Sequence, residues 1–165
     1  MRKLFFLLLN IFFTLSLTAQ TTDWVKSFGG TASDKGISIG TDSLGFIYCS
    51  GYFNNEATFG SITLTNNNLS TWGNNKENFV FKMDSFGTVL WAIPGGNQSG
   101  SCCDDRALGM HVTPGGDVFI TGTFWSSYHL GVNGALGTLS VPGSQTNAHD
   151  NSLLGRIDTD GNPVW

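Results

Sequence analysis

Charged side chains are scarce in this chain. They make up 12% of its 165 residues, and the formal net charge is −4. A protein that binds DNA or RNA needs a dense positive field to neutralise phosphates, so the composition argues against nucleic acid as a partner. Proline is also rare, at 4 residues, and no segment after the N-terminal apolar run has sustained helical periodicity. A helical fold is therefore not expected.

Glycine and aromatic residues dominate the composition instead. The chain has 22 glycines, 13 phenylalanines and 5 tryptophans. Glycine supplies turn positions with positive φ, and aromatic residues suit the half-buried surface of a pleated sheet. The composition predicts an all-β fold with many tight turns.

The first residues resemble an export signal. Arg2 and Lys3 precede an apolar run from Leu4 to Leu17, and small residues follow around Ala19. The run holds about 14 residues, fewer than the roughly 20 that span a bilayer as a helix. We interpret residues 1–19 as a signal peptide cleaved after Ala19, in preference to a buried strand or a membrane anchor, and expect a secreted or cell-surface protein with no membrane span after cleavage.

The rest of the chain repeats itself. Residues 34–53 return as residues 105–124, always 71 positions later, and residues 79–91 return as 153–165 with an offset of 74. A constant offset indicates a structural repeat rather than similar composition. The three extra residues of the second copy fall between Gly131 and Leu153, where a surface loop tolerates insertion.

Four tight turns divide the two copies, each starting with Asp or Thr and ending with Gly. Asp or Thr at the first position can accept hydrogen bonds from the following backbone, and Gly at the fourth accepts a left-handed conformation, so each turn predicts a β-hairpin. The turns are 42–45, 84–87, 113–116 and 158–161. The expected strands are 36–41, 46–53, 78–83, 88–93, 107–112, 117–124, 152–157 and 162 onward, with a short extra strand within 57–65.

Four antiparallel strands in a repeat of about 70 residues describe a propeller blade. The prediction is a partial β-propeller with two four-stranded blades, residues 34–93 and 94–165, the second truncated in its last strand. Trp24 matches Trp91 and Trp165, so residues 20–33 are expected to form an outer, ring-closing strand and a linker. Alternating apolar residues on the first strands are expected to face the neighbouring blade: Ile37, Ile39, Leu108, Met110 and Val112.

The motifs resemble those of secreted bacterial proteins built from SBBP β-propeller repeats. The first copy carries the Asp-x-Gly start at Asp34, the Asp-x-x-Gly-x-Ile-Tyr-x-x-Gly-x-Phe hairpin ending at Phe53, and the Lys-x-Asp-x-x-Gly-x-x-x-Trp ending at Trp91. The second copy departs from these motifs at Ala107, Thr113, Phe119 and Arg156. The resemblance implies a propeller of an exported protein, often part of a longer cell-surface polypeptide, and implies no particular substrate.

A ring of 4 to 8 blades is needed for closure, and two blades do not suffice. We therefore expect the chain to be the N-terminal fragment of a longer protein, whose remaining blades are its first partners. The alternative is a ring of identical chains, each donating its Trp24 strand to the next. Total blade number, oligomeric state and the continuation of the polypeptide after Trp165 stay open.

Candidate chemical sites are weak throughout. Asp158-x-Asp160 resembles the start of a calcium loop, but the matching turn at Asp84 offers one carboxylate and is explained as a hairpin. Asp104 and Asp105 are adjacent, whereas acid–base catalysis on glycosides needs carboxylates that face each other. The three histidines, His111, His129 and His149, have no ionisable counterparts in the first copy. We assign no catalytic, cofactor-binding or metal-binding residue and expect no cofactor.

The chain has three cysteines. Cys49 lies in an apolar strand and is expected to be a small buried hydrophobe. Cys102 and Cys103 are adjacent, and their pairing stays open because an odd total leaves at least one thiol unpaired within the chain.

The functional prediction is an exported, non-catalytic propeller segment that acts as a structural or ligand-binding scaffold for surface polysaccharide or protein. The alternative is part of a secreted propeller enzyme, a quinoprotein dehydrogenase or a carbohydrate-active enzyme, with its active site in blades beyond these residues. The repeat positions are interpreted as structural: Trp24, Asp34, Gly45, Gly51, Phe53, Asp84, Gly87, Trp91, Asp105, Gly116, Gly122, Phe124, Asp158, Gly161 and Trp165.

Overall fold

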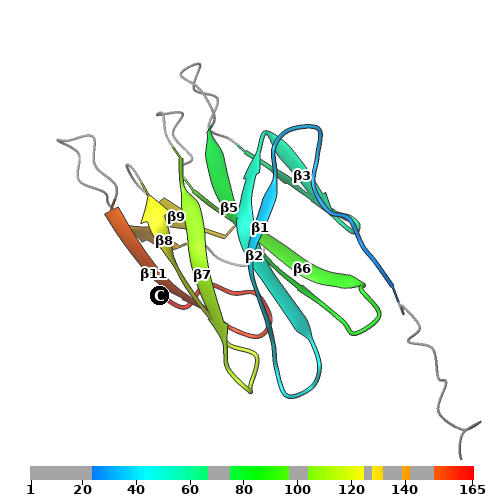
Figure 1. Cartoon of the computed structure of the whole chain (residues 1–165). Coiled ribbons are helices and arrows are strands. Elements are labelled where there is room, and N and C mark those ends of the chain that lie inside the picture. Colours follow the sequence, from blue (N-terminus) through cyan, green and yellow to red (C-terminus); the bar gives the residue numbers. More distant parts are fainter. Residues whose placement is uncertain (1–23, 67–74, 97–103, 125–127, 132–138, 142–150) are drawn as a thin grey trace, which may run out of the picture.

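The computed structural model describes residues 24–66, 75–96, 104–124, 128–131, 139–141 and 151–165 (Figure 1). This part of the chain is all-β, as expected, and contains no helix that could cross a membrane. The signal-peptide prediction for residues 1–19, Cys102, Cys103 and His149 lie outside the described residues. The strands are β1 (Lys35–Thr41), β2 (Ile47–Asn54), β3 (Glu56–Phe59), β4 (Ile62–Thr65), β5 (Lys76–Met83), β6 (Val89–Gly96), β7 (Arg106–Val112), β8 (Val118–Phe124), β9 (Tyr128–Leu130), β10 (Leu139–Val141) and β11 (Asn151–Ile157).

Each copy of the sequence repeat forms an antiparallel unit. In the first unit the strands pair in the order β1-β2-β5-β6, and in the second in the order β7-β8-β11. The fourth position of the second unit is held by residues 163–165, where Pro163 bridges Ile157 and the amide of Arg156 donates to the carbonyl of Trp165 at 2.7 Å. The predicted strand from residue 162 is thus an edge segment. The antiparallel sheets fit a partial β-propeller.

The four predicted turns are formed as expected. In every turn the amide of the closing glycine donates to the carbonyl of the first residue, at 2.9 to 3.2 Å. The four glycines, Gly45, Gly87, Gly116 and Gly161, have φ between +80° and +90°. This left-handed backbone favours glycine, which explains why these positions recur in the sequence.

The middle segment of each unit contains more β-structure than the sequence predicted. Residues 57–65 were expected to add one short strand, but they form the hairpin β3–β4, which turns at Gly60. The second unit has a corresponding hairpin, β9–β10, and its strand β9 pairs with β6 of the first unit. The second unit therefore extends the sheet of the first, and the first unit's β6 runs to Gly96, past the predicted boundary at residue 93.

The two units pack face to face and lie side by side in Figure 1. We call the face that carries Tyr48, Val80 and Trp91 the forward face of the first unit, and the opposite face, with Phe79 and Phe81, its rear face. The same alternation assigns a forward and a rear face to the second unit. The rear face of the second unit packs on the forward face of the first in one buried cluster: Tyr48, Val80, Trp91, Ile93, Val118, Ile120, Phe124, Tyr128, Leu130, Leu153 and Ile157.

The rear face of the first unit is covered too. Phe59, from the β3–β4 hairpin, lies 4.7 Å from Phe79 between ring centroids. Phe28, from the N-terminal segment 24–30, lies 5.0 Å from Phe81. Buried aromatic rings contribute large apolar areas, and both segments shield Phe79 and Phe81 from water.

The predicted orientation of the apolar side chains on β1 and β7 is partly wrong. Met110 and Val112 pack against the cluster between the units, but Ile39 and Leu108 are 70% and 54% exposed. The pairing register shifts between Gly36 and Ser38 and again between Ala107 and Gly109. Leu108 lies at the shift in β7, where a β-bulge inserts one residue and breaks the alternation of faces, which sequence periodicity alone does not reveal. Ile39 lies past the shift in β1 and pairs with Cys49, on the rear face of the first unit.

Candidate functional site

The contact between the two units centres on a tryptophan that docks onto a turn. The indole nitrogen of Trp91, on β6, donates to the backbone carbonyl of Thr159 at 3.1 Å. Trp91 is 8% exposed, and its ring lies over Gly161, where a Cβ would come within 2.9 Å of the ring. The turn thus provides both the acceptor and a flat backbone surface for the ring.

The same contact occurs a second time. The indole nitrogen of Trp24 donates to the carbonyl of Ser85 at 2.8 Å, and its ring lies 3.5 Å from the Cβ position of Gly87. Gly29, further along this segment, bridges Thr58 just as Gly96 on β6 pairs with His129 on β9. The N-terminal segment 24–30 therefore takes the place of a β6-like outer strand against the rear face of the first unit.

The turns that receive the tryptophans are held by their own aspartates. Asp84 accepts hydrogen bonds from the amides of Phe86 and Thr88, at 2.9 and 2.8 Å. The Thr88 backbone bond is the main cause that holds the pKa of Asp84 below its usual value. This carboxylate acts within its own turn.

Asp158 makes the corresponding contacts in the second unit. Burial would raise its pKa, but hydrogen bonds from the amide and side chain of Asn162 outweigh this and lower the pKa. Both oxygens of Asp158 accept hydrogen bonds from Asn162. The aspartate that resembles the start of a calcium loop therefore stabilises its own turn.

A polar cluster lies beside the Trp91 contact. The Lys82 ammonium donates to the carbonyl and hydroxyl of Thr159, at 3.1 and 2.9 Å, and lies 4.3 Å from the centroid of the Phe46 ring. Lys82 is buried, with Tyr48 beside it. The Tyr48 hydroxyl donates to Asp42 at 3.0 Å. This cluster joins β2, β5 and the turn 42–45 of the first unit to the turn 158–161 of the second unit.

A second polar contact crosses the units near their opposite end. The side-chain amide of Asn78 donates to the hydroxyl of Tyr128 at 3.0 Å. Burial raises the pKa of Tyr128, with smaller contributions from Asp105 and Glu77, so the hydroxyl stays protonated. Neither this contact nor that of Lys82 was predictable from the repeat pattern, because the two partners of each contact lie in different units.

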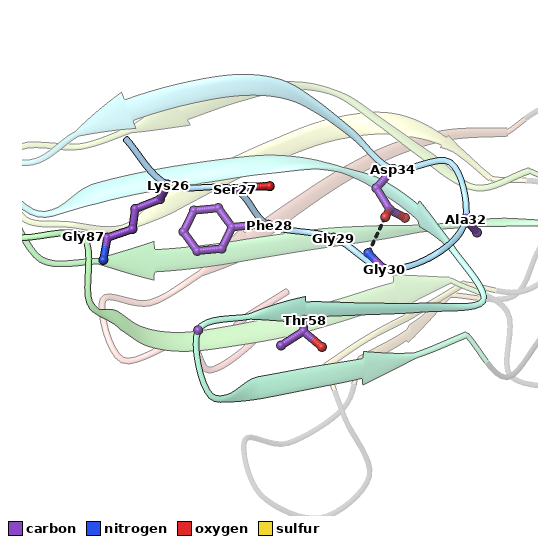
Figure 2. Close-up of a pocket in the computed structure, with 10 residues that line it drawn as sticks. Lys26, Ser27, Phe28, Gly29, Gly30, Ala32, Asp34, Thr58 and Gly87 are labelled. Carbon is purple, nitrogen blue, oxygen red and sulfur yellow. Dashed lines mark hydrogen bonds between the residues drawn. The ribbon is translucent and has the colours of Figure 1, made fainter. Parts of the chain in front are cut away.

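Each unit begins with an aspartate whose carboxylate lies beside an outer strand or segment. Asp34 accepts a hydrogen bond from the amide of Gly30 at 2.7 Å (Figure 2). It also accepts one from the amide of Asn54 at 3.3 Å. Its counterpart Asp105 is fully buried, and its carboxylate lies beside Gly96, the end of the outer strand β6. Asp34 thus links the N-terminal segment to the first unit.

Asp34 also borders an open groove of about 510 Å³. Figure 2 shows Lys26 and Asp34 toward opposite ends of this groove, with Phe28 and Thr58 between them. One cation, one carboxylate already bound to backbone and an open shape do not define a catalytic constellation.

The remaining candidates from sequence are separated. Asp104 forms ion pairs with Lys76, at 2.9 Å, and with Arg106, whereas Asp105 is buried at the outer strand. Burial would raise the pKa of Asp104, but the two cations hold it below its usual value. The adjacent carboxylates are therefore engaged separately.

Histidine and cysteine form no cluster in the described part of the chain. His111 is exposed on β7, His129 lies on β9, and no group of three His, Cys, Asp or Glu residues there could hold a metal ion. Cys49 is a free thiol packed beside the buried residues on the rear face of the first unit, and burial raises its pKa to about 11.

Two repeated glycines have a packing explanation. A Cβ at Gly51 would lie 2.0 Å from the carbonyl of Lys35, and one at Gly122 would lie 2.1 Å from the carbonyl of Arg106. The first two strands of each unit therefore approach too closely for any side chain at this position.

A comparison with known protein families gives a match in the N-terminal part of the chain. Residues 23–55 match a family model described as a β-propeller repeat, SBBP. The matched residues include segment 24–30, β1 and β2. None of the curated proteins matches the chain.

Proposed function

Because the chain is an SBBP-type β-propeller repeat protein, we propose that it acts as an exported, non-catalytic scaffold that presents its surface to polysaccharide or protein at or outside the cell. The observation that carries this proposal is the repeated tryptophan contact. Trp24 and Trp91 dock in the same way onto successive turns, and this repetition builds an extended surface rather than one reactive centre.

The polar residues of the repeats support a structural role. The carboxylates of Asp34, Asp42, Asp84 and Asp158 each accept hydrogen bonds from nearby backbone amides. A general acid or base must be free to exchange a proton with a substrate, and these groups are engaged in turns and strand ends. The competing hypothesis of a propeller enzyme requires residues outside the described part of the chain.

Export is supported by the basic residues, the apolar run and the small residues near Ala19. The test is expression of the full chain with a C-terminal tag in a bacterium that carries a Sec system. We expect the protein outside the cytoplasm with Gln20 as its first residue, while a variant with Leu7→Arg and Leu8→Arg keeps residues 1–19 and stays inside. Cytoplasmic retention of an uncleaved chain would contradict export.

The scaffold role is tested on the exported protein with an array of glycans and with assays for glycoside hydrolysis and for dehydrogenase activity after addition of pyrroloquinoline quinone. We expect saturable binding without turnover. Turnover that survives further purification would overturn the non-catalytic proposal, and the absence of binding to glycans would direct the search to surface proteins.

A further inference from the structure

We propose that the groove beside the N-terminal segment 24–30 is a binding site for an uncharged saccharide, as part of a polysaccharide chain. This inference rests on the proposed scaffold function and locates one binding surface for it. The groove is lined by this segment, by the β3–β4 hairpin and by the turn 84–87 (Figure 2). Its volume of about 510 Å³ falls within the range of about 300–1,000 Å³ that is usual for small-ligand sites.

The groove is a departure of the first unit from the repeat. In the second unit the matched place is closed, because the amide of Gly131 donates to the carbonyl of Pro94 at 2.9 Å. The matched residues of the first unit, Gly60 and Ser27, share no backbone hydrogen bond in the part of the chain that the structure describes. The segment and the hairpin therefore separate beyond the bridge at Gly29, and the groove opens between them.

The side chain at a key position of the groove explains why the space is open. Lys26 matches Ile93, which is fully buried in the cluster between the units. Lys26 is exposed instead, and its Cε lies 2.9 Å from the Cβ position of Gly87, so its stem rests on the turn. A polar side chain thus replaces a core residue, and the matched volume is left accessible to a ligand.

The two ends of the groove offer opposite hydrogen-bonding groups. Lys26 forms no ion pair with any described residue, so its ammonium donors are available to a ligand. At the other end each oxygen of Asp34 accepts one backbone hydrogen bond and retains a second lone pair. Hydroxyl groups both donate and accept, so a ligand rich in hydroxyls satisfies both ends. Because the two charges balance, an uncharged ligand fits better than an ionic one.

The floor between these ends is apolar. Figure 2 shows the ring of Phe28 between Lys26 and Asp34. The ring is held against Phe81 and Phe59, at 5.0 and 6.1 Å between centroids, and it is only half-buried. A fixed aromatic surface with polar groups at its rim matches a sugar ring, whose C–H face is apolar and whose edge carries hydroxyls.

Other classes of ligand fit less well. An extended peptide that adds a strand needs an open sheet edge, but Gly29 and Thr58 already exchange two backbone hydrogen bonds, at 3.2 and 3.0 Å. This bridge crosses the space in which an added strand would lie. A ligand rich in phosphate needs several cations, and Lys26 is the one cation among the described residues that line the groove.

The experiment is an NMR titration of the exported full chain with soluble neutral probes: cello-, laminari-, manno-, xylo- and malto-oligosaccharides. At least one probe should bind with a Kd of about 1 mM or tighter. The amide signals of Ser27, Gly60 and Gly87 should shift, while those of β11 should stay unchanged. The Kd should be the same at about 0.1 M and about 1 M salt, because the ligand carries no charge to be screened.

Two variants test the groove itself. Lys26→Met keeps the apolar stem on Gly87 and removes the ammonium, and it should raise the Kd about tenfold or more. Lys35→Met, at an exposed lysine on β1 outside the groove, is the matched control and should change the Kd by less than about threefold. Ser27→Trp should abolish binding, because its ring fills the groove. Urea unfolding should show that the variants remain folded, and the map of shifted amides in the unmodified chain locates the site even if one of them does not fold.

The outcomes separate this inference from the scaffold function. Amide shifts outside the groove, or a Kd that Lys26→Met and Ser27→Trp leave unchanged, would overturn the groove as the site. Binding by none of the neutral probes, or binding only by oligogalacturonate titrated in the same way, would overturn the uncharged saccharide as its ligand. Export and the absence of turnover are measured separately, so each of these results leaves the scaffold function standing.

Discussion

The indole nitrogen of Trp91 lies 3.1 Å from the carbonyl oxygen of Thr159, in the next repeat unit. The ring also covers Gly161 and belongs to the buried cluster between the units. One side chain thus joins the outer strand of one unit to a turn of the next by a hydrogen bond and by apolar contact. Trp165 occupies the matched position without these contacts and is 51% exposed.

Trp91→Ala should destabilise the chain by about 3–5 kcal/mol, because it removes a large buried side chain and leaves a cavity. Trp165→Ala should cost less than about 1 kcal/mol, because half of this side chain is exposed. Urea unfolding followed by circular dichroism measures both. Equal losses for the two variants would contradict the role assigned to the contact between the units.

Gly161→Ala and Gly45→Ala separate backbone strain from packing. Both glycines have positive φ, +90° and +83°, so each substitution should cost about 1–2 kcal/mol. A Cβ at Gly161 would also lie 2.9 Å from Trp91, whereas nothing lies within 4 Å of one at Gly45. Gly161→Ala should therefore cost about 1–3 kcal/mol more, measured by the difference in urea unfolding free energy. Identical costs would show that the turn does not pack against the tryptophan.

Stability should fall in acid through the turn aspartates. The pKa of Asp158 is lowered in the folded chain, so folding favours its ionised form. Its contribution is present above the unfolded pKa of about 3.9 and is lost as pH falls through the lower folded pKa. Asp158→Asn should flatten the decrease in urea midpoint below about pH 4. Asp160→Asn, an exposed neighbour, serves as the control.

Asp34→Ala should release the N-terminal segment from the first unit. The substitution leaves the amide of Gly30 without its 2.7 Å acceptor, at a cost of about 1–2 kcal/mol. Hydrogen exchange should quicken in residues 24–30 and at Thr58, which pairs with Gly29. Exchange in β11, on the far unit, should not change, and a uniform increase across the chain would instead indicate global destabilisation.

Cys49 should react slowly in the folded chain. With a pKa of about 11, about one thiol in a thousand is ionised at pH 8. Alkylation by iodoacetamide, followed by mass spectrometry of the Cys49 peptide, should be about a hundredfold slower than in urea-unfolded chain, where the thiol has an ordinary pKa. Similar rates in the two states would show that the thiol is open to solvent.

The sequence predicted the local structure well because turns and strands have local causes. The Asp-x-x-Gly turns fix the hairpins through short hydrogen bonds and a glycine with positive φ, and these appear directly in the repeat. The equivalence of Trp24 and Trp91 was visible in the same way. In the structure both dock onto turns through matched contacts.

Contacts between the units were not predictable from the same pattern. The pairing of β9 with β6, the Lys82 contact with Thr159 and the Asn78 contact with Tyr128 each depend on the relative position of two units. Ile39 matches Met110 and pairs with Cys49 on the rear face of the first unit, where it is 70% exposed, because burial at this position depends on the unit that lies against it. Periodicity records which residues share a strand face, and it does not record which distant strand lies against that face.

The pairing of β9 with β6 has a consequence for recombination between repeats. The hairpin encoded in the second repeat completes the sheet edge of the first, so the segment that is repeated in the sequence differs from the segment that forms one sheet. A crossover placed between the two sequence copies would separate β6 from the hairpin that covers it. Exchanges that retain residues 76–141 as one block keep this edge paired.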